Sequence, residues 1–245
     1  MLPTRWALAG ITVAGMVATP LARRRGPTRR ALANVVVAGA AVTTTLSATS
    51  RWSPRRAVAA AGLAATATAM IEHLGSATGV PFGRYRYTGR LRPTVGGVPV
   101  VVPLAWWAMA LPAREAAHAA LGRATSLPAR IGAGAAALTA WDLFLDPQMT
   151  AEGYWRWDRG GAYRGIPLSN YGGWLAVGTA VMAGLEVLLP PGVPVAALVA
   201  QYAVTAIMQT VGFLCFFGDP LVAAVGGAGM LPVAAFAVGA LVRRA

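Results

Sequence analysis

The chain has 245 residues, of which 56% are hydrophobic and only 12% are charged, and its mean hydropathy is +0.56. This composition excludes an ordinary soluble globular protein, because apolar segments long enough to cross a bilayer recur along the whole length. The net charge of +13 comes entirely from arginine. The arginines lie in short clusters between the apolar segments, which is typical of inner-membrane proteins and argues against nucleic-acid binding.

We therefore predict an all-α fold, a polytopic integral membrane bundle of seven or eight transmembrane helices that forms a single domain over residues 1–245. The continuous Ala-rich segments lack the alternation of a membrane β-barrel. Cys215 is the only cysteine, so one chain can form neither a disulfide nor a cysteine metal site. The candidate spans are residues 5–22, 31–49, 56–74, 97–113, 127–146, 173–189, 193–217 and 221–242.

With eight spans, alternate linkers lie on the same side of the membrane. The two longest polar linkers, 75–96 and 147–172, then share one side, together with the polar ends of the spans that border them. The linkers of this side also contain more arginines than those of the other side, so we expect the polar layer at the cytoplasmic face of a bacterial or archaeal inner membrane. A single layer of polar residues is what one functional site requires.

The third span ends in Glu72-His73, after a run of Ala, Thr and Met. Neighbouring residues of a helix point about 100° apart, so only one of the two is expected to face a site directly. Glu72 is the candidate acid or base, and His73 is a candidate hydrogen-bond partner that would orient a carboxyl group. The alternative is a helix-end pair in the headgroup region.

Aromatic residues cluster next to this pair, in the linker over 79–87 and at the start of the fourth span. They include Phe82, Tyr85, Trp106 and Trp107. Such residues form belts at membrane interfaces, and the same residues could instead form the wall of a pocket. Beside carboxylates, their ring faces would also stabilise a developing cation.

The fifth span ends with Asp142 and Asp146, which are four residues apart and therefore project from the same side of a helix. Two close carboxyl groups near the membrane boundary cannot both ionise without cost, so we expect one of them to hold a proton. Acidic residues in a spanning helix are costly and usually functional. The alternatives are an interfacial pair neutralised by arginine, or a Mg²⁺-diphosphate site with DxxxD spacing.

The stretch from Trp141 to Trp174 contains half of the tryptophans and half of the acidic residues of the chain. In a chain this apolar, such a concentration marks a candidate site. Its further members are the following side chains: Trp141, Tyr154, Trp155, Trp157, Asp158, Asn170 and Tyr171.

Taken in order, four motifs resemble those of the CruF-type carotenoid hydratases, a family of integral membrane enzymes. They are Glu72-His73 with the linker over 79–87, residues 97–106, residues 141–149 and residues 165–171, and the resemblance covers about residues 70–220. It implies addition of water across the terminal double bond of an acyclic carotenoid, without a redox cofactor or a metal. The implied partners are the carotenoid, water, the lipid bilayer and other enzymes of carotenoid biosynthesis.

In this chemistry a neutral carboxylic acid protonates the alkene, aromatic faces and a carboxylate stabilise the tertiary cation, and a water molecule adds to it. We expect Asp142, Asp146 and Glu72 to form the acid and base set, with Asp158 and Asn170 holding the water. Three alternatives stay open on sequence: a carotenoid cyclase, a Mg²⁺-dependent prenyltransferase, and a transporter or non-catalytic assembly protein.

Overall fold

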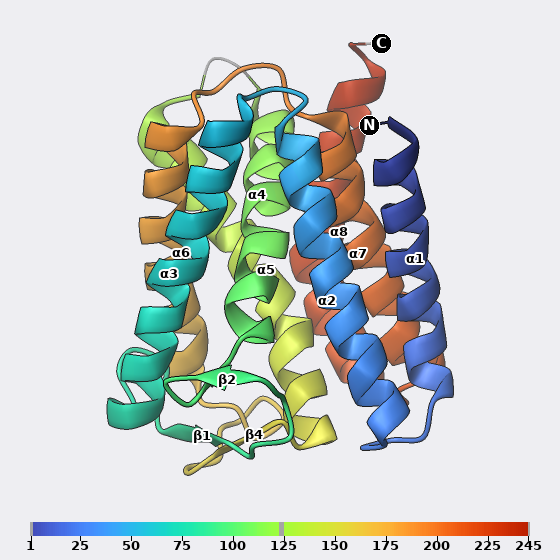
Figure 1. Ribbon diagram of the computed structural model, residues 1–245, viewed down its shortest axis with the longest axis vertical. Helices are drawn as coiled ribbons and strands as arrows, with labels where there is room; N and C mark the ends of the chain where they lie inside the picture. Colours follow the sequence, from blue (N-terminus) through green and yellow to red (C-terminus); the bar gives the residue numbers. More distant parts are fainter. Residues whose placement is uncertain (1, 123–124, 245) are drawn as a thin grey trace.

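The computed structural model describes residues 2–122 and 125–244, and this part of the chain forms a bundle of eight long helices (Figure 1). Five of them, α2, α3, α6, α7 and α8, are long and apolar enough to cross a membrane. The prediction of an all-α, multi-pass membrane bundle is therefore confirmed. The helices are α1 (Leu2–Leu21), α2 (Pro27–Ala48), α3 (Pro54–Thr78), α4 (Val101–Leu121), α5 (Leu127–Glu152), α6 (Leu168–Leu188), α7 (Ala196–Cys215) and α8 (Pro220–Val242).

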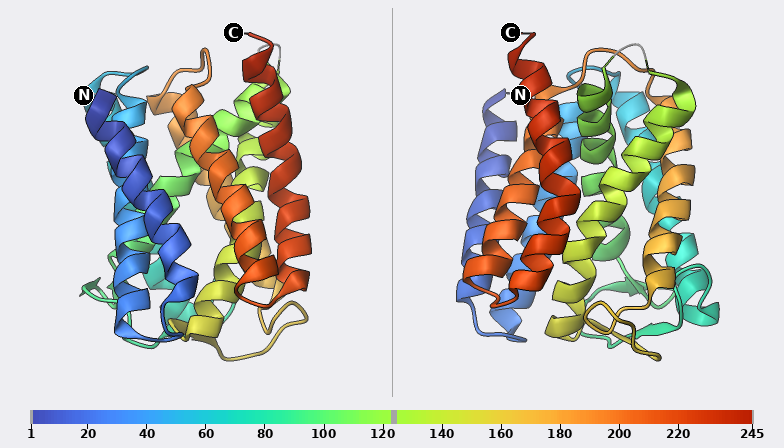
Figure 2. Two further views of the ribbon diagram at one scale, coloured as in Figure 1. Left: turned by 90° about the vertical axis from the view of Figure 1, so that its right-hand side faces the viewer. Right: turned by 180° about the vertical axis from the view of Figure 1, so that it is seen from behind.

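Helix α4 lies at the centre of the bundle and packs against α2, α3, α5, α7 and α8 (Figures 1 and 2). Most of its side chains from Ala105 to Ala119 are buried. Helix α4 and its neighbour α5 carry most of the buried charged residues of the core, the others being Arg29 on α2 and Glu72 on α3, and neither α4 nor α5 meets the composition of a membrane-spanning helix. The charge is tolerated because these two helices are largely shielded from lipid by the others.

Three predicted spans are too short at their C-terminal ends. The third span was expected to end at 74, but α3 continues to Thr78. The fourth span was expected to end at 113, but α4 continues to Leu121, because Arg114 and Glu115 form an ion pair of 2.8 Å and need not leave the core. The fifth span was expected to end at 146, but α5 continues through Pro147 to Glu152. As a result, Asp142 and Asp146 lie inside a helix rather than at its end.

Four short strands lie at one end of the bundle, in the two long polar linkers. Strand β1 (Tyr85–Tyr87) pairs antiparallel with β4 (Trp155–Trp157), with Tyr85 opposite Trp157 and Tyr87 opposite Trp155. Strands β2 (Thr94–Val95) and β3 (Val98–Pro99) form a hairpin. In β1 and β4 the aromatic residues alternate with exposed arginines, so the period of two turns the rings toward the bundle. Both chain termini lie at the opposite end (Figure 1).

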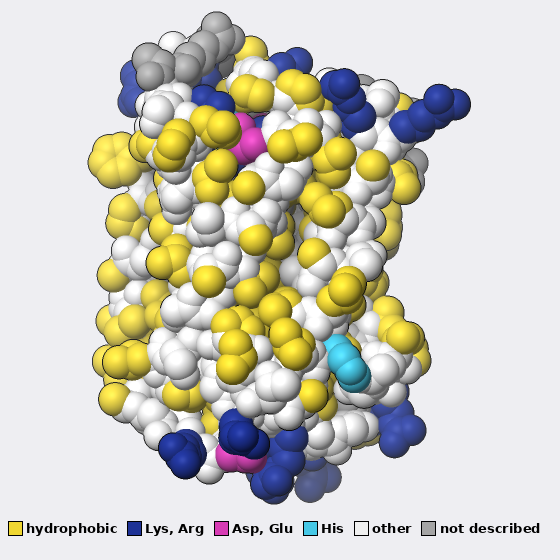
Figure 3. Space-filling model, turned by 90° about the vertical axis from the view of Figure 1, so that its left-hand side faces the viewer, with side chains coloured by type: hydrophobic (Ala, Val, Ile, Leu, Met, Phe, Trp, Pro, Cys, Tyr) yellow, Lys and Arg dark blue, Asp and Glu magenta, His cyan; other side chains and the backbone are white. Residues whose placement is uncertain are grey.

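The outer surface of the bundle suits a bilayer. Uncharged side chains cover the middle of the face seen in Figure 3, and basic side chains gather at its two ends. Large apolar residues such as Met70 and Val187 are more than two-thirds exposed on the outer faces of their helices. In water such a surface would aggregate, whereas lipid chains solvate it.

A buried ion pair fixes the N-terminal helices to α5. Arg29 Nη1 lies 2.6 Å from Glu152 Oε1, and both side chains are about 95% buried. The remaining guanidinium nitrogens of Arg29 donate to the carbonyl oxygens of Thr19 and Pro20, while Glu152 Oε2 accepts from the backbone N–H of Arg25. This arrangement satisfies both charges and closes α1 and α2 onto the end of the bundle that has the strands.

Candidate active site

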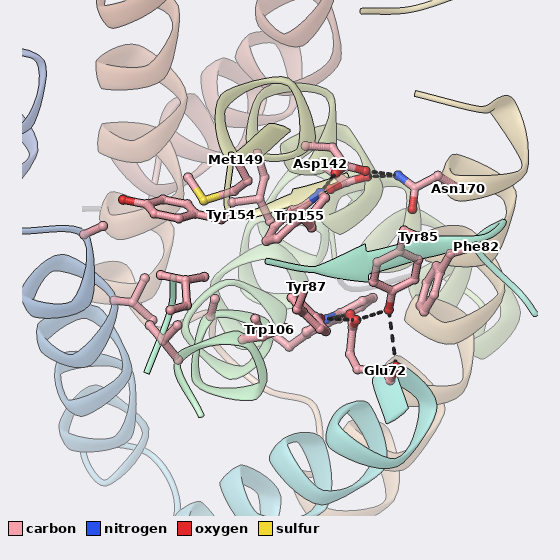
Figure 4. A pocket seen from close by; sticks show the side chains of 18 of the residues that line it. Glu72, Phe82, Tyr85, Tyr87, Trp106, Asp142, Met149, Tyr154, Trp155 and Asn170 are labelled. Atoms are coloured by element: carbon pink, nitrogen blue, oxygen red, sulfur yellow. Dashed lines mark hydrogen bonds between the residues drawn. The ribbon is translucent and has the colours of Figure 1, made fainter. Parts of the chain in front are cut away.

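A cavity of about 90 Å³ lies between the helices, just inside the layer of strands (Figure 4). Its wall is mostly aromatic and aliphatic, and three carboxyl groups face it: Glu72 from α3, and Asp142 and Asp146 from α5. The three side chains come from α3 and α5. The alternation of the predicted spans had placed the polar ends of these two helices on the same side of the membrane. Their neighbours in the wall include Phe82, Tyr85, Tyr87, Trp106, Tyr154, Trp155, Trp157, Asn170 and Trp174.

Asp142 and Asp146 are both buried, lie one helical turn apart, and share one hydrogen-bond donor. The side-chain amide of Asn170 donates to Asp142 Oδ2 at 2.6 Å and also to Asp146 Oδ2 (Figure 4). Trp155 Nε1 donates to the other oxygen of Asp146 at 2.5 Å. Asp142 Oδ1 has no hydrogen-bond partner among the described residues. Two buried carboxyl groups this close cannot both carry a negative charge without a large cost, so a proton shared by the pair is favoured.

Glu72 is held by three donors on the other side of the cavity. Tyr85 and Tyr87 donate their hydroxyl groups to Glu72 Oε2 at 2.5 and 2.7 Å, and Trp106 Nε1 donates to Oε1 at 3.1 Å. Burial raises the pKa of both phenols, and the adjacent Glu72 carboxylate raises it further, so both remain protonated donors at neutral pH. The Glu72 carboxyl group is therefore fixed in position and in orientation.

Aromatic rings line the space between the two acidic groups. Trp106 stacks on Trp174 with ring centroids 3.7 Å apart and planes 10° from parallel. Tyr85 lies 5.1 Å from Trp157, and Tyr87 meets Trp155 edge-to-face at 6.0 Å. Such a wall binds an apolar ligand and presents ring faces that attract a positive charge.

Residues 7–242 match the family model described as "Carotenoid biosynthesis protein". The chain belongs to this family. It is also 36% identical over 125 residues to a bisanhydrobacterioruberin hydratase from Haloarcula japonica. That match covers 49% of this chain and 42% of the relative, so the chain matches less than half of the relative's length. No solved structure matches.

The resemblance to the carotenoid hydratases that the sequence motifs indicated is thus confirmed at the level of the family. The family match extends over nearly the whole chain, whereas the motifs covered about residues 70–220. The first two helices, in which we matched no motif, therefore belong to the family region as well. This matters for the site, because α2 contributes Ala33, Asn34 and Val37 to the cavity wall.

Two residues predicted to take part in catalysis lie outside the cavity of this family member. His73 is exposed on the outer side of α3, and its Nδ1 lies 2.8 Å from the carbonyl oxygen of Gly96 in the β2–β3 hairpin. Asp158 is exposed and lies 3.8 Å from Arg86. Neither is in position to orient a buried carboxyl group or to hold water there. The 100° between neighbouring helix positions explains why Glu72 faces inward and His73 outward.

Three aromatic residues predicted for substrate binding are also absent from the cavity wall. Trp107 faces α2 and donates to Thr45 Oγ1 at 2.9 Å. Trp141 packs edge-to-face on Trp174, with ring centroids 6.0 Å apart. Tyr171 contacts Tyr163 edge-to-face, with ring centroids 6.0 Å apart. All three support neighbouring side chains rather than the cavity itself, since a helix turns adjacent residues to different faces.

Three polar or aromatic residues of the wall were not among the predicted site residues, nor were its aliphatic members. Tyr87 stands two positions after Tyr85, so the Tyr-Arg-Tyr alternation of a strand would have placed both rings on one face. Trp174 lies four residues after Asn170, one helical turn away. Asn34 is an isolated amide in the apolar run of α2, and its Oδ1 is buried without a hydrogen-bond partner among the described residues.

A second charged cluster lies at the opposite end of the bundle. Glu186 on α6 is within 3.4 Å of Arg114, His118 and Arg130, and Arg114 also pairs with Glu115. Each of these acidic oxygens faces a cation or a backbone N–H, as in the bond from Val195 N to Glu115 Oε2 at 2.8 Å. This cluster links α4, α5 and α6 and is separate from the cavity. Within the described residues, no group of three or more His, Cys, Asp or Glu side chains could hold a metal ion.

Proposed function

We propose that this protein adds water across the terminal C=C bond of an acyclic carotenoid end group and produces a tertiary alcohol. The observation that supports this most directly is a pair of buried carboxyl groups, Asp142 and Asp146, facing an aromatic cavity within a membrane bundle. Membership of the carotenoid biosynthesis family and the partial likeness to a hydratase support it from a different direction. The substrate is apolar and dissolves in the lipid that surrounds the helices.

The first step is protonation of the alkene by the aspartate pair. We assign one shared proton to Asp142 and Asp146. Their common donor, the amide of Asn170, is neutral, so no positive charge is supplied by it to stabilise a second negative charge on the pair. Asp142 Oδ1 is the carboxyl oxygen of the pair without a partner, so it is our candidate for the proton-donating atom. Proton transfer to the less substituted alkene carbon breaks the π bond and leaves a tertiary carbocation.

The second step is stabilisation of this cation by the opposite wall. Glu72 would act as its counter-ion, since three donors hold the carboxyl group in a fixed position. The ring faces of Trp106, Tyr85 and Trp157 add attraction between the cation and the aromatic quadrupoles. Because these groups are held by packing, little reorganisation is needed when the charge develops.

The third step is capture of the cation by water. The oxygen of water forms a bond to the tertiary carbon, and one of its protons returns to the aspartate pair, which regenerates the starting acid. The sum is one water added and no change in oxidation state, so the reaction needs no electron donor or acceptor. In our proposal Asn170 keeps the two carboxyl groups together while the proton leaves and returns.

The test is mass spectrometry of pigments from a host that produces acyclic carotenoids and expresses this chain. We expect a product heavier by one water, or by two if both ends react. Asp142→Asn and Asp146→Asn should each abolish this product while the protein remains in the membrane. Asp158→Asn is the matched control, because Asp158 is exposed outside the cavity, and it should leave the product unchanged.

Other results would move the assignment. A ring-closed product of unchanged mass would indicate a cyclase that uses the same protonation. Dependence on Mg²⁺ and an isoprenyl diphosphate would indicate a prenyltransferase. An unchanged pigment profile, with the protein verified in the membrane and several acyclic carotenoids tested, would favour binding or transport without turnover.

A further inference from the structure

The cavity is closed at the carboxyl groups and open at the side. Glu72, Asp146 and Asn170 are at most 6% exposed. By contrast, the wall residues on α2 and at the start of α4 are partly exposed. These rim residues are Ala33, Asn34, Val37, Val101 and Val102. Figure 4 shows Tyr154 and Met149 on the side of the cavity nearer the blue N-terminal helices, with Asn170 and Phe82 on the other side. Leu145 and Met149 on α5 line the cavity and are partly exposed as well, so the open side is lateral, among α2, α4 and α5, and the reactive groups lie at the inner end.

The rim lies beside outward-facing apolar side chains, a surface that lipid chains would solvate. Ala33 to Val37 are in the second and third turns of α2, roughly 9–15 Å along the helix axis from its first residue. Val35, between the rim positions, is 47% exposed, and Met70 on α3 is 68% exposed. Asn34 is the polar exception, and its Oδ1 is buried. Figure 1 shows α2 and α3 close together at the end near the termini and diverging toward the strands, with α4 behind them.

The end of the bundle that has the strands is covered. Strands β1 and β4 lie across it and are paired by backbone hydrogen bonds; Tyr85 and Trp155 from these strands are less than 10% exposed, and Tyr87 and Trp157 are partly buried. Leu91, which precedes the β2–β3 hairpin, is also buried and lines the cavity. Thr88 N donates to the carbonyl oxygen of Tyr154 at 3.0 Å, which ties the two linkers together. A long hydrocarbon would have to displace this cover to enter from water, but not to enter from lipid.

We propose that the rim residues on α2 and α4 form a lateral entrance through which the carotenoid enters end-first from the bilayer. The end group reaches the carboxyl groups, and the polyene remains in the entrance and in the surrounding lipid during the reaction. The inference rests on the proposed function, since it takes the acyclic carotenoid as the ligand. It adds a specificity rule: a larger side chain at the rim slows long substrates more than short ones with the same end group, because only the long ones still occupy the entrance during the reaction.

The experiment is a size series at Val37, with Ala, Leu, Phe and Trp in turn, and the same series at Val35. Val37 lines the cavity, whereas Val35 faces outward two positions earlier on the same helix. Each purified variant, reconstituted in vesicles, receives a long acyclic carotenoid or a short acyclic terpene with the same end group. We expect hydration of the carotenoid to fall by about tenfold or more from Val to Trp at 37. The terpene rate at 37 should fall by at least about threefold less than the carotenoid rate, and both substrates at 35 should change by less than about threefold.

Equal rates for the carotenoid across the Val37 series would overturn the entrance. So would an equal loss of both substrates in variants that remain monodisperse with an unchanged melting temperature. A variant that is not monodisperse is replaced by the next smaller residue of the series, so the comparison still has a result. Failure of the proposed function is a separate outcome, because the wild-type protein would then hydrate neither substrate.

Discussion

Asp142 and Asp146 are joined through a third side chain, because the amide of Asn170 donates to one oxygen of each. The two acids belong to consecutive turns of α5, and the amide comes from the first turn of α6. The site therefore depends on how these two helices meet as well as on the spacing of the acids. If either helix moved, the two carboxyl groups would lose their common donor at the same time.

The first prediction concerns this shared donor. Asn170→Ala removes the N–H groups from two buried carboxyl groups, which costs about 1–3 kcal/mol for each group left unsatisfied. We expect the melting temperature to fall and the hydration rate per folded molecule to fall by about 10²-fold, because the proton is no longer positioned. Rate and melting temperature are measured on the same detergent-purified sample.

Thr179→Ala is the control for this experiment. Thr179 lies on the same helix, is exposed, and donates to the carbonyl oxygen of Leu175 within its own helix. It should leave both quantities unchanged. A fully active Asn170→Ala protein would contradict the assignment of the aspartate pair as the proton donor.

The second prediction compares two adjacent glycines at the start of α6. A Cβ atom at Gly173 would lie 2.7 Å from Phe82 and 3.0 Å from Pro81, whereas at Gly172 nothing lies within 4 Å. Gly173→Ala must therefore move the 81–82 segment, which carries one wall of the cavity. We expect a clear loss of hydration for Gly173→Ala and an unchanged rate for Gly172→Ala. Equal rates for the two variants would mean that this wall is not needed.

Much of this site could be predicted from the sequence, because it follows from helix periodicity and hydropathy. The four-residue spacing of Asp142 and Asp146 placed them on one face, and the parity of the spans placed Glu72 in the same layer. The structure agrees on both placements. Their catalytic roles remain proposals.

Other features depended on contacts that sequence patterns do not contain. The pairing of Tyr85 with Trp157 joins two distant linkers, and no local propensity indicates such a partner. The continuation of α5 through Pro147 depends on packing, since proline inside a helix usually ends it. The exposure of His73 depended on the rotation of α3 about its axis, and that of Asp158 on the path of the linker after β4.

The third prediction concerns the donors of Glu72. Tyr85→Phe and Tyr87→Phe each remove a hydroxyl group that donates to Glu72 Oε2. A hydrogen bond to a charged group is worth about 1.5–3 kcal/mol, so each change should slow hydration by roughly tenfold to a hundredfold. Because both hydroxyl groups share one acceptor atom, we expect the double variant to lose less than the product of the two single losses. Rates are measured in vesicles at saturating carotenoid.

The same tyrosines give an expectation for pH. Burial and then the charge of Glu72 raise the pKa of both phenols, so their ionisation begins above the ordinary value of about 10. Below that value both remain donors, and no loss of rate from this source should occur as the pH rises from neutral. A fall in rate near pH 8–9 that disappears in Tyr85→Phe or Tyr87→Phe would contradict this.

The fourth prediction separates stability from chemistry at the far end of the bundle. Glu186→Gln removes the negative charge that faces Arg114, His118 and Arg130, all three of which are less than one-fifth exposed at the side chain. Breaking a buried ion pair costs about 3–5 kcal/mol, because the remaining charge is left without its partner. We therefore expect a large drop in melting temperature, while the product and the rate per folded molecule stay as in the wild type. If the rate per folded molecule fell as strongly as it does in Asp142→Asn, the far cluster would be coupled to the cavity, and the site would have to include α4 along its whole length.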